Sequence, residues 1–480
     1  MNNNIQWIQD VIYDYIGFTR SNGDKIVAEK NIIDSPWVQR LRRILQLQAS
    51  WLVFPNAVHT RFLHSLGAMH LAGEMAGHLY PFFKQAFPHE SIPEKNHVIE
   101  VFRLAGLLHD IGHSPMGHLI DDIYLYKYYR KTHEDISAKI ITEELGDLIR
   151  KIRISPSGPF EQRIEPALIV KFIKLPSDYR NYQVWEQVFS KIMFGVYSVD
   201  SIDFLLRDKY FSGLKEVGEI SYKRLIDQSF LSPNGLTLTR AALPVLRAFL
   251  TTRFNLFKNI YYNENKDVLE KSFGGLIPDT FRLMKLGDVY KKLDQFLFLD
   301  DFSLNTRIRN WSREKNRTKR ALAEEWLKIL DSRILPYKKI YEEEDFIYHF
   351  REAGAIITVE ELEKKVRKVL GARHVISRNI VDVRNKNLLV RFRSREDLRQ
   401  HDDSKVIAMY DEKNKVFMDQ DENDLFNDIP LKYYVLRVFV DKKSPVDRLD
   451  RNNIKDLQLE LGLKGRYLNE VKNRTEITNV

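Results

Sequence analysis

Residues 104–118 read LAGLLHDIGHSPMGH, an apolar helical run that closes on the adjacent pair His109 and Asp110 and is followed by two more histidines. On a regular helix, neighbouring side chains point about 100° apart and cannot share a ligand. Gly112 and Pro115 are helix-ending residues, so we expect the helix to end at the pair and both side chains to face one ion. Imidazole and carboxylate ligands together suit Fe, Mn, Zn, Ni or Mg. The stretch therefore predicts a divalent metal ion at the end of a helix.

The sequence on both sides of this stretch supplies further ligands. Ten of the 13 histidines lie between residues 59 and 133, and the absence of cysteine excludes thiolate ligands and disulfides. Upstream, HTRFLHSLG places Arg61 and His64 three residues apart on one helix face, so a guanidinium would sit beside a metal-bound imidazole, which suits a phosphate-bearing substrate. Downstream, YSVDSIDFLLRD supplies Asp200, while Asp203 and Arg207 are spaced for a local ion pair.

Length and composition indicate a globular protein. With 480 residues and 44% hydrophobic side chains, the chain is long enough for a large core and more than one domain. No apolar run approaches the ~20 residues of a membrane helix, and the N-terminus lacks the pattern of a signal peptide, so we expect a cytoplasmic protein with no membrane partner. A net charge of +9 favours polyanionic partners such as nucleotides or nucleic acid.

The apolar spacing predicts a mainly α fold with a smaller C-terminal α+β lobe. From residue 35 to about residue 350 the apolar residues recur mostly at helical spacing, interrupted by a turn at SPNG (232–235) between two short extended runs. After Gly354 the pattern changes to one helix, 357–371, and five strands. The expected strands are 375–384, 387–394, 405–410, 415–419 and 433–440. We therefore expect three parts: 1–353, 354–443 and a polar, basic tail, 444–480.

Five segments carry a resemblance to a known family. They are DSPWVQRLRRILQLQ, HTRFLHSLG, GLLHDIGHSPMGH, THEDIS and SVDSIDFLLRD. The H…HD…D pattern formed by His64, His109, Asp110 and Asp200 resembles the HD superfamily of metal-dependent phosphohydrolases. Within that superfamily, the chain is similar to bacterial relatives of the SAM-and-HD-domain deoxynucleoside triphosphate triphosphohydrolases, over about the first two-thirds of its length. We expect no SAM domain in this chain.

The resemblance implies roles for three sets of residues, with the helical part of the chain as the HD domain. The implied metal ligands are His64, His109, Asp110 and Asp200. The implied catalytic residues around the α-phosphate are His113, His118, Asp121 and His133. The implied contacts to base, sugar or phosphates are Gln46, Arg61, Arg253 and Tyr261. The i, i+3 spacing further predicts that Asp121 orients His118, which would act as the general acid toward the departing nucleoside oxygen.

The chain also departs from the family pattern. Ser201 stands where relatives commonly have Lys or Arg, and Phe204 stands where a Tyr is expected, so one phosphate contact is missing. Phe257 and Tyr262 replace His and Gln, which puts base recognition in doubt. A regulatory guanine-nucleotide site at a subunit interface is only partly matched, by Asp34, Gln39 and Arg42.

Three functions are consistent with the sequence. The leading one is metal-dependent hydrolysis of deoxynucleoside triphosphates to deoxynucleoside and triphosphate by a homo-oligomer, a dimer or tetramer. The second keeps the metal site but acts on another nucleotide, a cyclic nucleotide or a nucleic-acid end. The third is a nucleic-acid-binding or regulatory protein with a vestigial HD site, for which weak single-stranded nucleic acid binding by the basic run 307–320 would be the sign; a charge run is more often a solvated helix face.

Simpler explanations compete for individual residues. The three histidines at 113, 118 and 133 could cap helices or satisfy core polar groups, and Arg61 could form a structural ion pair. Arg253 and Tyr261, eight residues apart on a helical pattern, could lie at the edge of the core.

Overall fold

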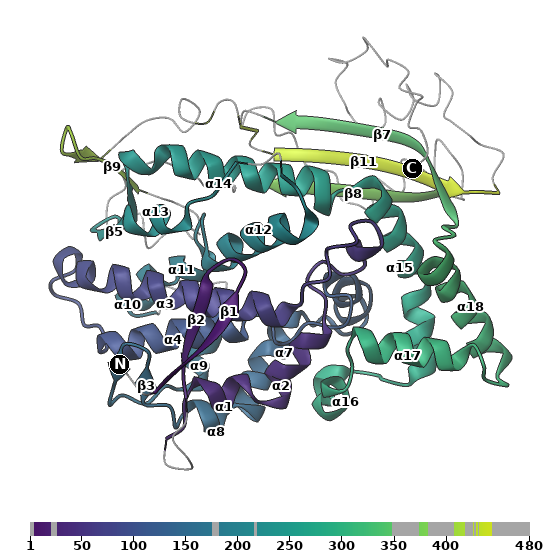
Figure 1. Cartoon of the computed structure of the whole chain (residues 1–480), viewed down its shortest axis with the longest axis horizontal. Helices are drawn as coiled ribbons and strands as arrows, with labels where there is room; N and C mark the ends of the chain where they lie inside the picture. The colour runs from purple at the N-terminus through teal and green to yellow at the C-terminus, as the bar shows by residue number, and fades with distance from the viewer. Residues whose placement is uncertain are drawn as a thin grey trace, which may run out of the picture.

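The computed structural model describes residues 4–20, 26–174, 182–215, 218–347, 374–382, 408–417, 426, 429–430 and 432–443. Over these ranges the fold is mainly helical, with a few small sheets, as the sequence predicts (Figure 1). No helix in the described ranges is both long and apolar enough to cross a membrane.

The helices fall into two groups along the chain. The earlier ones are α1 (Glu29–Ile33), α2 (Pro36–Arg40), α3 (Arg61–Ala86), α4 (Lys95–Leu108), α5 (His118–Ile120), α6 (Lys127–Tyr129), α7 (His133–Lys139), α8 (Gly146–Ile149) and α9 (Pro166–Lys171). The later ones are α10 (Val184–Phe189), α11 (Lys191–Phe194), α12 (Val199–Ser212), α13 (Tyr222–Asp227), α14 (Leu243–Leu256), α15 (Glu264–Met284), α16 (Leu293–Leu297), α17 (Asp301–Trp311) and α18 (Arg317–Ser332). Wider π-helical turns occur at Asp121–Tyr126, Ile140–Glu144 and Phe257–Tyr261.

The strands form four small sheets. They are β1 (Ile5–Asp10), β2 (Asp14–Thr19), β3 (Ile154–Ser155), β4 (Gly158–Pro159), β5 (Ser229–Ser232), β6 (Gly235–Thr239), β7 (Tyr337–Ile347), β8 (His374–Asp382), β9 (Ala408–Asp411), β10 (Val416–Phe417) and β11 (Lys432–Asp441). The sheet orders are β1-β2, β3-β4, β10-β9-β6-β5 and β7-β11-β8. The turn expected at residues 232–235 joins β5 to β6 as an antiparallel hairpin.

Strand β7 corrects the expectation that helices continue to about residue 350. Pro336 directly precedes this strand, which pairs antiparallel with β11 from Tyr337 opposite Asp441 to Ile347 opposite Lys432. Because the partner strand lies far along the chain, local apolar spacing carries no sign of this pairing.

The C-terminal strands lie close to their expected positions where they are described. Strands β8, β9, β10 and β11 overlap four of the five expected segments. The expected helix at 357–371, the expected strand at 387–394 and the tail from residue 444 lie outside the described residues. Strand β9 pairs in parallel with β6, so strands from both sides of residue 353 share one sheet. The domain boundaries themselves stay predictions.

Helices α3 and α4 pack side by side in the left half of the view in Figure 1. Every residue of α4 from His97 to Leu108 is buried, and the apolar cluster around it extends through most of the helical part. The close approach depends on Gly106, because a Cβ there would lie 2.6 Å from the carbonyl oxygen of Ala68 on α3. The crossing therefore brings the start of α3 next to the end of α4.

The loop after α4 is held by the N-terminal end of α7. Ser137 donates a hydrogen bond to the carbonyl oxygen of His109 (2.9 Å) and accepts one from the backbone N–H of Gly112 (3.0 Å). A Cβ at Gly112 would lie 2.2 Å from the carbonyl oxygen of His133, so only glycine fits. The loop that carries His109 and Asp110 is therefore held in place by α7.

We expect Gly106→Ala to destabilise the fold by roughly 1–3 kcal/mol, because the added methyl group meets backbone atoms that cannot move alone. Gly275→Ala on α15 is the matched control, since nothing lies within 4 Å of its added Cβ. That replacement should raise the free energy of unfolding by about 0.5–1 kcal/mol through helix propensity. Urea denaturation of both variants measures the difference, and equal effects would contradict the packing argument.

Candidate metal centre and substrate cavity

The four residues expected to bind a metal converge from three helices. His64 lies in the first turn of α3, His109 and Asp110 follow the end of α4, and Asp200 lies in the first turn of α12. His64 Nε2 lies 3.2 Å from His109 Nε2 and 3.1 Å from Asp200 Oδ1. His109 Nε2 lies 3.4 Å from Asp110 Oδ1 and 3.4 Å from Asp200 Oδ1. Ligand distances near 2.0–2.2 Å place neighbouring ligand atoms about 3 Å apart, so one ion fits among these atoms.

Both imidazoles present Nε2 to the centre because Nδ1 is engaged elsewhere. His109 Nδ1 lies 2.8 Å from the carbonyl oxygen of Gly106, and His64 Nδ1 lies 2.8 Å from Asp203 Oδ2. A carbonyl or carboxylate oxygen only accepts hydrogen bonds, so each Nδ1 carries the proton. The Nε2 atoms therefore face the centre and can bind a metal once any proton on them is lost, which is the usual arrangement around metal-binding histidines.

The electrostatics of this group also favour a cation. Burial lowers the pKa of His64, but hydrogen bonds with Asp200 and Asp203 outweigh it and raise that pKa to about 10. Burial raises the pKa of Asp200, yet hydrogen bonds with His109 and His64 outweigh it and hold that pKa below its usual range. The pKa of Asp110 is also lowered, since the charges of His109 and Arg61 outweigh its burial. The carboxylates thus stay ionised, and the donor set fits a divalent metal ion.

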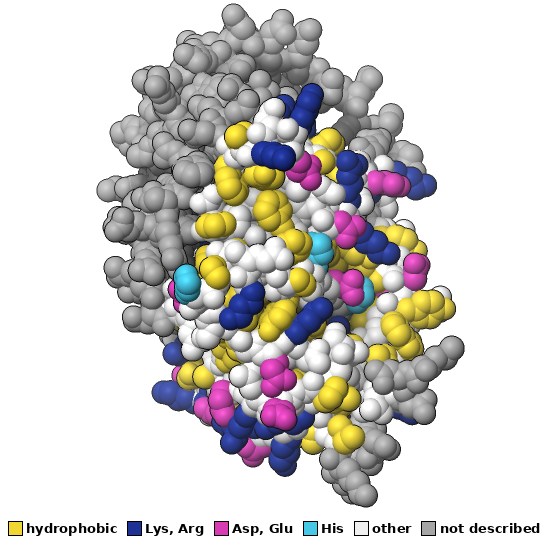
Figure 2. Space-filling model, turned by 90° about the vertical axis from the view of Figure 1, so that its left-hand side faces the viewer, with side chains coloured by type: hydrophobic (Ala, Val, Ile, Leu, Met, Phe, Trp, Pro, Cys, Tyr) yellow, Lys and Arg dark blue, Asp and Glu magenta, His cyan; other side chains and the backbone are white. Residues whose placement is uncertain are grey.

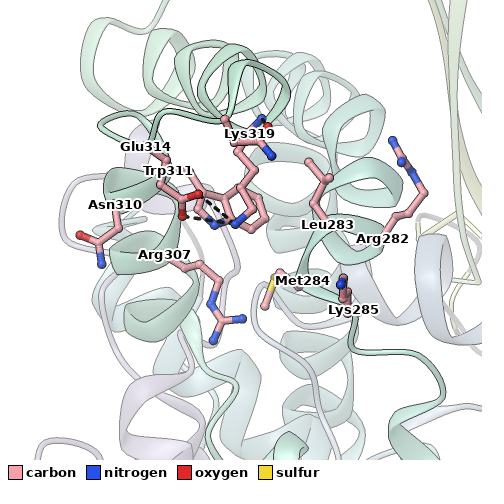
Figure 3. A pocket seen from close by; sticks show the side chains of 10 residues that line it. Arg282, Leu283, Met284, Lys285, Arg307, Asn310, Trp311, Glu314 and Lys319 are labelled. Atoms are coloured by element: carbon pink, nitrogen blue, oxygen red, sulfur yellow. Dashed lines mark hydrogen bonds and ion pairs between the residues drawn. The ribbon is translucent and has the colours of Figure 1, made fainter.

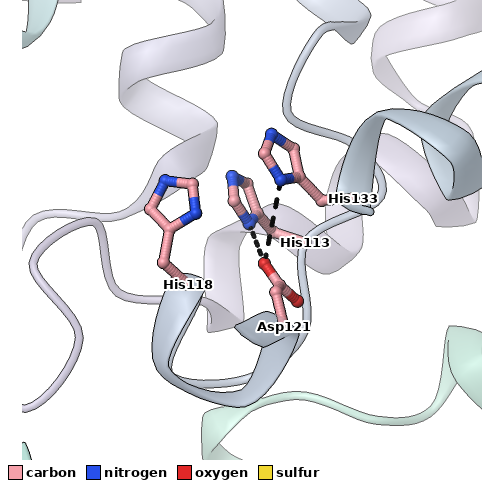
Figure 4. A group of neighbouring side chains, drawn as sticks. All are labelled: His113, His118, Asp121 and His133. Atoms are coloured by element: carbon pink, nitrogen blue, oxygen red, sulfur yellow. Dashed lines mark hydrogen bonds and ion pairs between the residues drawn. The ribbon is translucent and has the colours of Figure 1, made fainter. Parts of the chain in front are cut away.

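A second group of side chains consists of His113, His118, Asp121 and His133, which lie together in Figure 4. The ring of His113 stacks on that of His133 with centroids 3.8 Å apart, and the ring of His118 meets both edge to face. His113 Nε2 also lies 3.3 Å from Asp110 Oδ1, which links the two groups. The structure therefore places all four expected catalytic residues together.

The partner of Asp121 differs from the sequence expectation. Asp121 Oδ2 lies 2.5 Å from Nδ1 of His113 and 4.0 Å from Nδ1 of His133, and among the described residues no hydrogen bond or ion pair joins it to His118. The i, i+3 rule assumes a regular helix, but Gly117 adopts a φ of +49° and a π-helical turn begins at Asp121. Asp121 therefore orients His113, and its expected pairing with His118 is wrong.

The imidazoles of His118 and His133 are held neutral. Burial, followed by the charge of His113, lowers the pKa of His133 to about 4. The pKa of His118 is lowered by burial and by the charges of His113 and Arg61. Burial raises the pKa of Asp121, but the charge of His113 and its hydrogen bond lower it to about 2. For one of these imidazoles to act as a proton donor, negative charge must be added nearby to raise its pKa.

A cavity of about 590 Å³ opens onto both groups. The four expected substrate contacts, Gln46, Arg61, Arg253 and Tyr261, all line it, together with His109, Asp110, His118, His133 and Asp200. Gln46 Oε1 and Arg61 Nε are buried without a hydrogen-bond partner, as expected of groups that await a ligand. Arg61 also pairs with Asp110 through Nη1, so it touches the metal group and the cavity at once.

Several contacts at the site have no clear signal in the sequence. Tyr261 donates a hydrogen bond to Asp208 Oδ2 (2.5 Å), and Asp208 Oδ1 lies 2.7 Å from His59 Nε2. His59 is buried and stacks on Phe211. Lys266 also lines the cavity and forms an ion pair with Glu270 (2.5 Å).

The three residues that partly match a regulatory site, Asp34, Gln39 and Arg42, form two separate local contacts. Arg42 Nε donates to Gln39 Oε1 (2.8 Å), whereas Asp34 forms an ion pair with Lys30.

The basic run 307–320 forms part of a different cavity, of about 740 Å³ (Figure 3). It lies among α15, α17 and α18 and shares no lining residue with the first cavity. Within the run, Arg309 pairs with Asp331 (2.6 Å) and Lys319 with Glu314 (3.0 Å). These ion pairs are typical of a solvated helix surface. Figure 2 shows the side of the molecule away from α17 and α18, where basic and acidic side chains are also interspersed.

Comparison with known proteins agrees with this geometry. The HD domain family matches residues 61–173, which include Arg61, His64, His109 and Asp110. Residues 61–173 of this chain therefore match an HD domain, and the His and Asp side chains gathered there could hold a metal ion.

Three known proteins are similar to this chain over larger ranges. An HD domain-containing protein of Acanthamoeba polyphaga mimivirus is 27% identical over 61% of this chain and 62% of its own length. A deoxynucleoside triphosphate triphosphohydrolase SAMHD1 homolog of Dictyostelium discoideum is 28% identical over 58% of this chain and 51% of its own length. This chain thus spans roughly half to three-fifths of these relatives. A crystal structure of an Aquifex aeolicus protein has the same fold, with a TM-score of 0.64 and 21% identity over 95% of this chain and all of that one.

Asp200→Ala should remove the bound metal ion, because it deletes a negative ligand that offsets the cation. Its carboxylate is 36% exposed, so the variant is expected to fold. Asp110→Ala should have the same effect. The matched control is Asp147→Ala, whose side chain is 92% exposed and remote from both groups. Elemental analysis of the purified proteins checks this, and equal metal contents in all of them would contradict it.

Proposed function

We propose that this protein hydrolyses deoxynucleoside triphosphates to the deoxynucleoside and an intact triphosphate. The observation that carries the proposal is that one cavity joins the metal group, the histidine group and the four expected substrate contacts. The cavity volume lies in the range of small-molecule sites. The resemblance to a Dictyostelium deoxynucleoside triphosphate triphosphohydrolase homolog supports the choice of substrate.

Different side chains of the cavity bind different parts of the substrate. Arg61 and Arg253 supply positive charge for the phosphates, and the ring of Tyr261 forms the wall against the sugar. The hydroxyl of Tyr261 is tied to Asp208, and Asp208 is tied to His59, so the ring is held in place. A fixed ring excludes a ribose 2′-hydroxyl by crowding and leaves it without a hydrogen-bond partner.

The reaction breaks the bond between the α-phosphorus and the 5′ oxygen. A water oxygen bonds to the α-phosphorus, the 5′ oxygen leaves with the nucleoside and takes up a proton, and the triphosphate departs with the new oxygen. A divalent ion held by His64, His109, Asp110 and Asp200 would polarise the phosphoryl oxygens and make water more acidic. His118 is placed to supply the proton, because a triphosphate beside the neutral imidazoles raises their pKa.

We expect His118→Ala to lose ~10²–10⁴ in turnover while keeping its metal, since a positioned acid has been removed. Asp121→Asn should lose less, because Asp121 acts on His113 rather than on the proton donor. His97→Ala is the matched control, because His97 bonds to the backbone of Gln162 and does not line the cavity. Steady-state kinetics with metal analysis distinguishes these cases. Near-full activity of His118→Ala would assign the acid to His133 or His113.

A panel of nucleotides with the products resolved tests the substrate. We expect deoxyribonucleotides to be preferred over ribonucleotides by ~10² or more in kcat/KM, with weak selectivity for the base. Tyr261→Ala should admit ribonucleotides, whereas Tyr261→Phe keeps the ring but loses its hydrogen bond to Asp208 and should admit them to a smaller extent. Release of pyrophosphate or phosphate, or comparable rates with GTP and dGTP, would instead favour hydrolysis of another nucleotide or of a nucleic-acid end by the same metal group.

The assembly of the protein stays a prediction. We propose a homo-oligomer, as the resemblance implies, and closed symmetric assemblies are the common form of soluble homo-oligomers. Light scattering with and without dGTP gives its mass.

A further inference from the structure

The N-terminal hairpin β1–β2 reaches into the interior at its turn. Asp10 and Tyr13 are each only 7% exposed, unlike Trp7 and Tyr15 on the outer face of the same hairpin, which are 61% and 57% exposed. Asp10 Oδ1 accepts hydrogen bonds from the backbone N–H groups of Ile12 (2.9 Å) and Tyr13 (3.2 Å). The turn is therefore built around the buried carboxylate of Asp10, which leaves Oδ2 for another partner.

The partner of Asp10 Oδ2 is Arg207, the first member of a series of contacts that ends at His64. Arg207 donates from Nη1 to Asp10 Oδ2 (2.9 Å), and from Nη2 and Nε to the two oxygens of Asp203 (2.9 and 3.0 Å). The hydroxyl of Tyr13 donates to Asp203 Oδ1 (2.8 Å). Asp203 Oδ2 then accepts the Nδ1 proton of His64 (2.8 Å). Residues 190 positions apart in sequence thus meet behind a metal ligand.

The space around these contacts admits no alternative arrangement. Asp203 and Arg207 are fully buried. Gly67 lies one turn beyond His64 on α3, and a Cβ there would lie 1.8 Å from Asp203 Oδ1 and 2.7 Å from Arg207 Nη2. The glycine therefore leaves room for the carboxylate to reach His64, and the hairpin closes the remaining side.

We propose that the hairpin is a positioning element of the metal centre: Tyr13 directly, and Asp10 through Arg207, hold Asp203 so that His64 keeps its proton on Nδ1 and its Nε2 toward the metal. The inference rests on the metal centre of the proposed function. A carboxylate that orients a metal-binding imidazole typically changes metal affinity 10–100-fold when it is lost. A hairpin that served only to cover the core would affect stability without affecting the metal.

The test measures metal binding directly, without nucleotide or turnover. Co²⁺ is titrated into metal-free full-length protein, and its visible absorption reports both affinity and ligand geometry. We expect Asp203→Asn to bind Co²⁺ roughly 10–100-fold more weakly. Tyr13→Phe, which removes one hydroxyl without changing shape, should bind it roughly 3- to 10-fold more weakly and with a changed spectrum. Asp10→Asn should resemble Tyr13→Phe.

Tyr15→Phe on the outer face of the hairpin is the matched control and should leave both affinity and spectrum unchanged. Unfolding midpoints are recorded for every variant, so Tyr13→Phe remains informative if Asp203→Asn does not fold. A lower midpoint for Tyr13→Phe and Asp10→Asn with unchanged Co²⁺ affinity and spectrum overturns the positioning role but leaves the metal centre intact. Failure of the unaltered protein to take up Co²⁺ overturns the metal centre, and the positioning role with it.

Discussion

The backbone contact between α3 and α4 is the constraint on which the site depends. Because Gly106 has no side chain, its backbone lies against Ala68, and the two buried helices cross closely just before α4 ends. His64 near the start of α3 then faces His109 at the end of α4, with their Nε2 atoms 3.2 Å apart. A larger residue at the crossing would push the two helices apart. It would therefore separate these imidazoles even though it touches no catalytic side chain. Packing in the core therefore sets the geometry of the metal group.

Electrostatic balance explains why so many buried charges are tolerated here. Leaving a buried charge without a partner costs several kcal/mol, whereas a fully paired group costs far less. Arg207 compensates Asp203 and Asp10, and Arg61 compensates Asp110. The carboxylate of Asp200 contacts only the two imidazoles among the described residues. The negative charge that remains at the centre is what a divalent cation would neutralise.

The residues named from the sequence lie together in the structure, whereas most contacts among them were not predicted. The pair His109 and Asp110 carries a local signal, because the helix must end for both side chains to face one ion, whereas the roles of the histidine group came from the family resemblance. The pairing of Asp121 was wrong because a positive φ at Gly117 and a π-helical turn replace the regular helix that the spacing rule assumes. The contact between His59 and Asp208 spans 149 positions, and strand β7 pairs with the distant β11, so neither leaves a local pattern.

The two imidazoles of the metal group are oriented by different means, and this has a consequence for folding. His109 is fixed by the carbonyl oxygen of Gly106 in its own helix, so its orientation follows as soon as α4 forms. His64 is fixed by Asp203 from α12, which in turn depends on the hairpin turn at Tyr13. One half of the centre is therefore local and the other requires the tertiary fold to close. Because a metal ion stabilises whichever state presents all its ligands, binding at this centre should favour the state in which the N-terminal hairpin is docked.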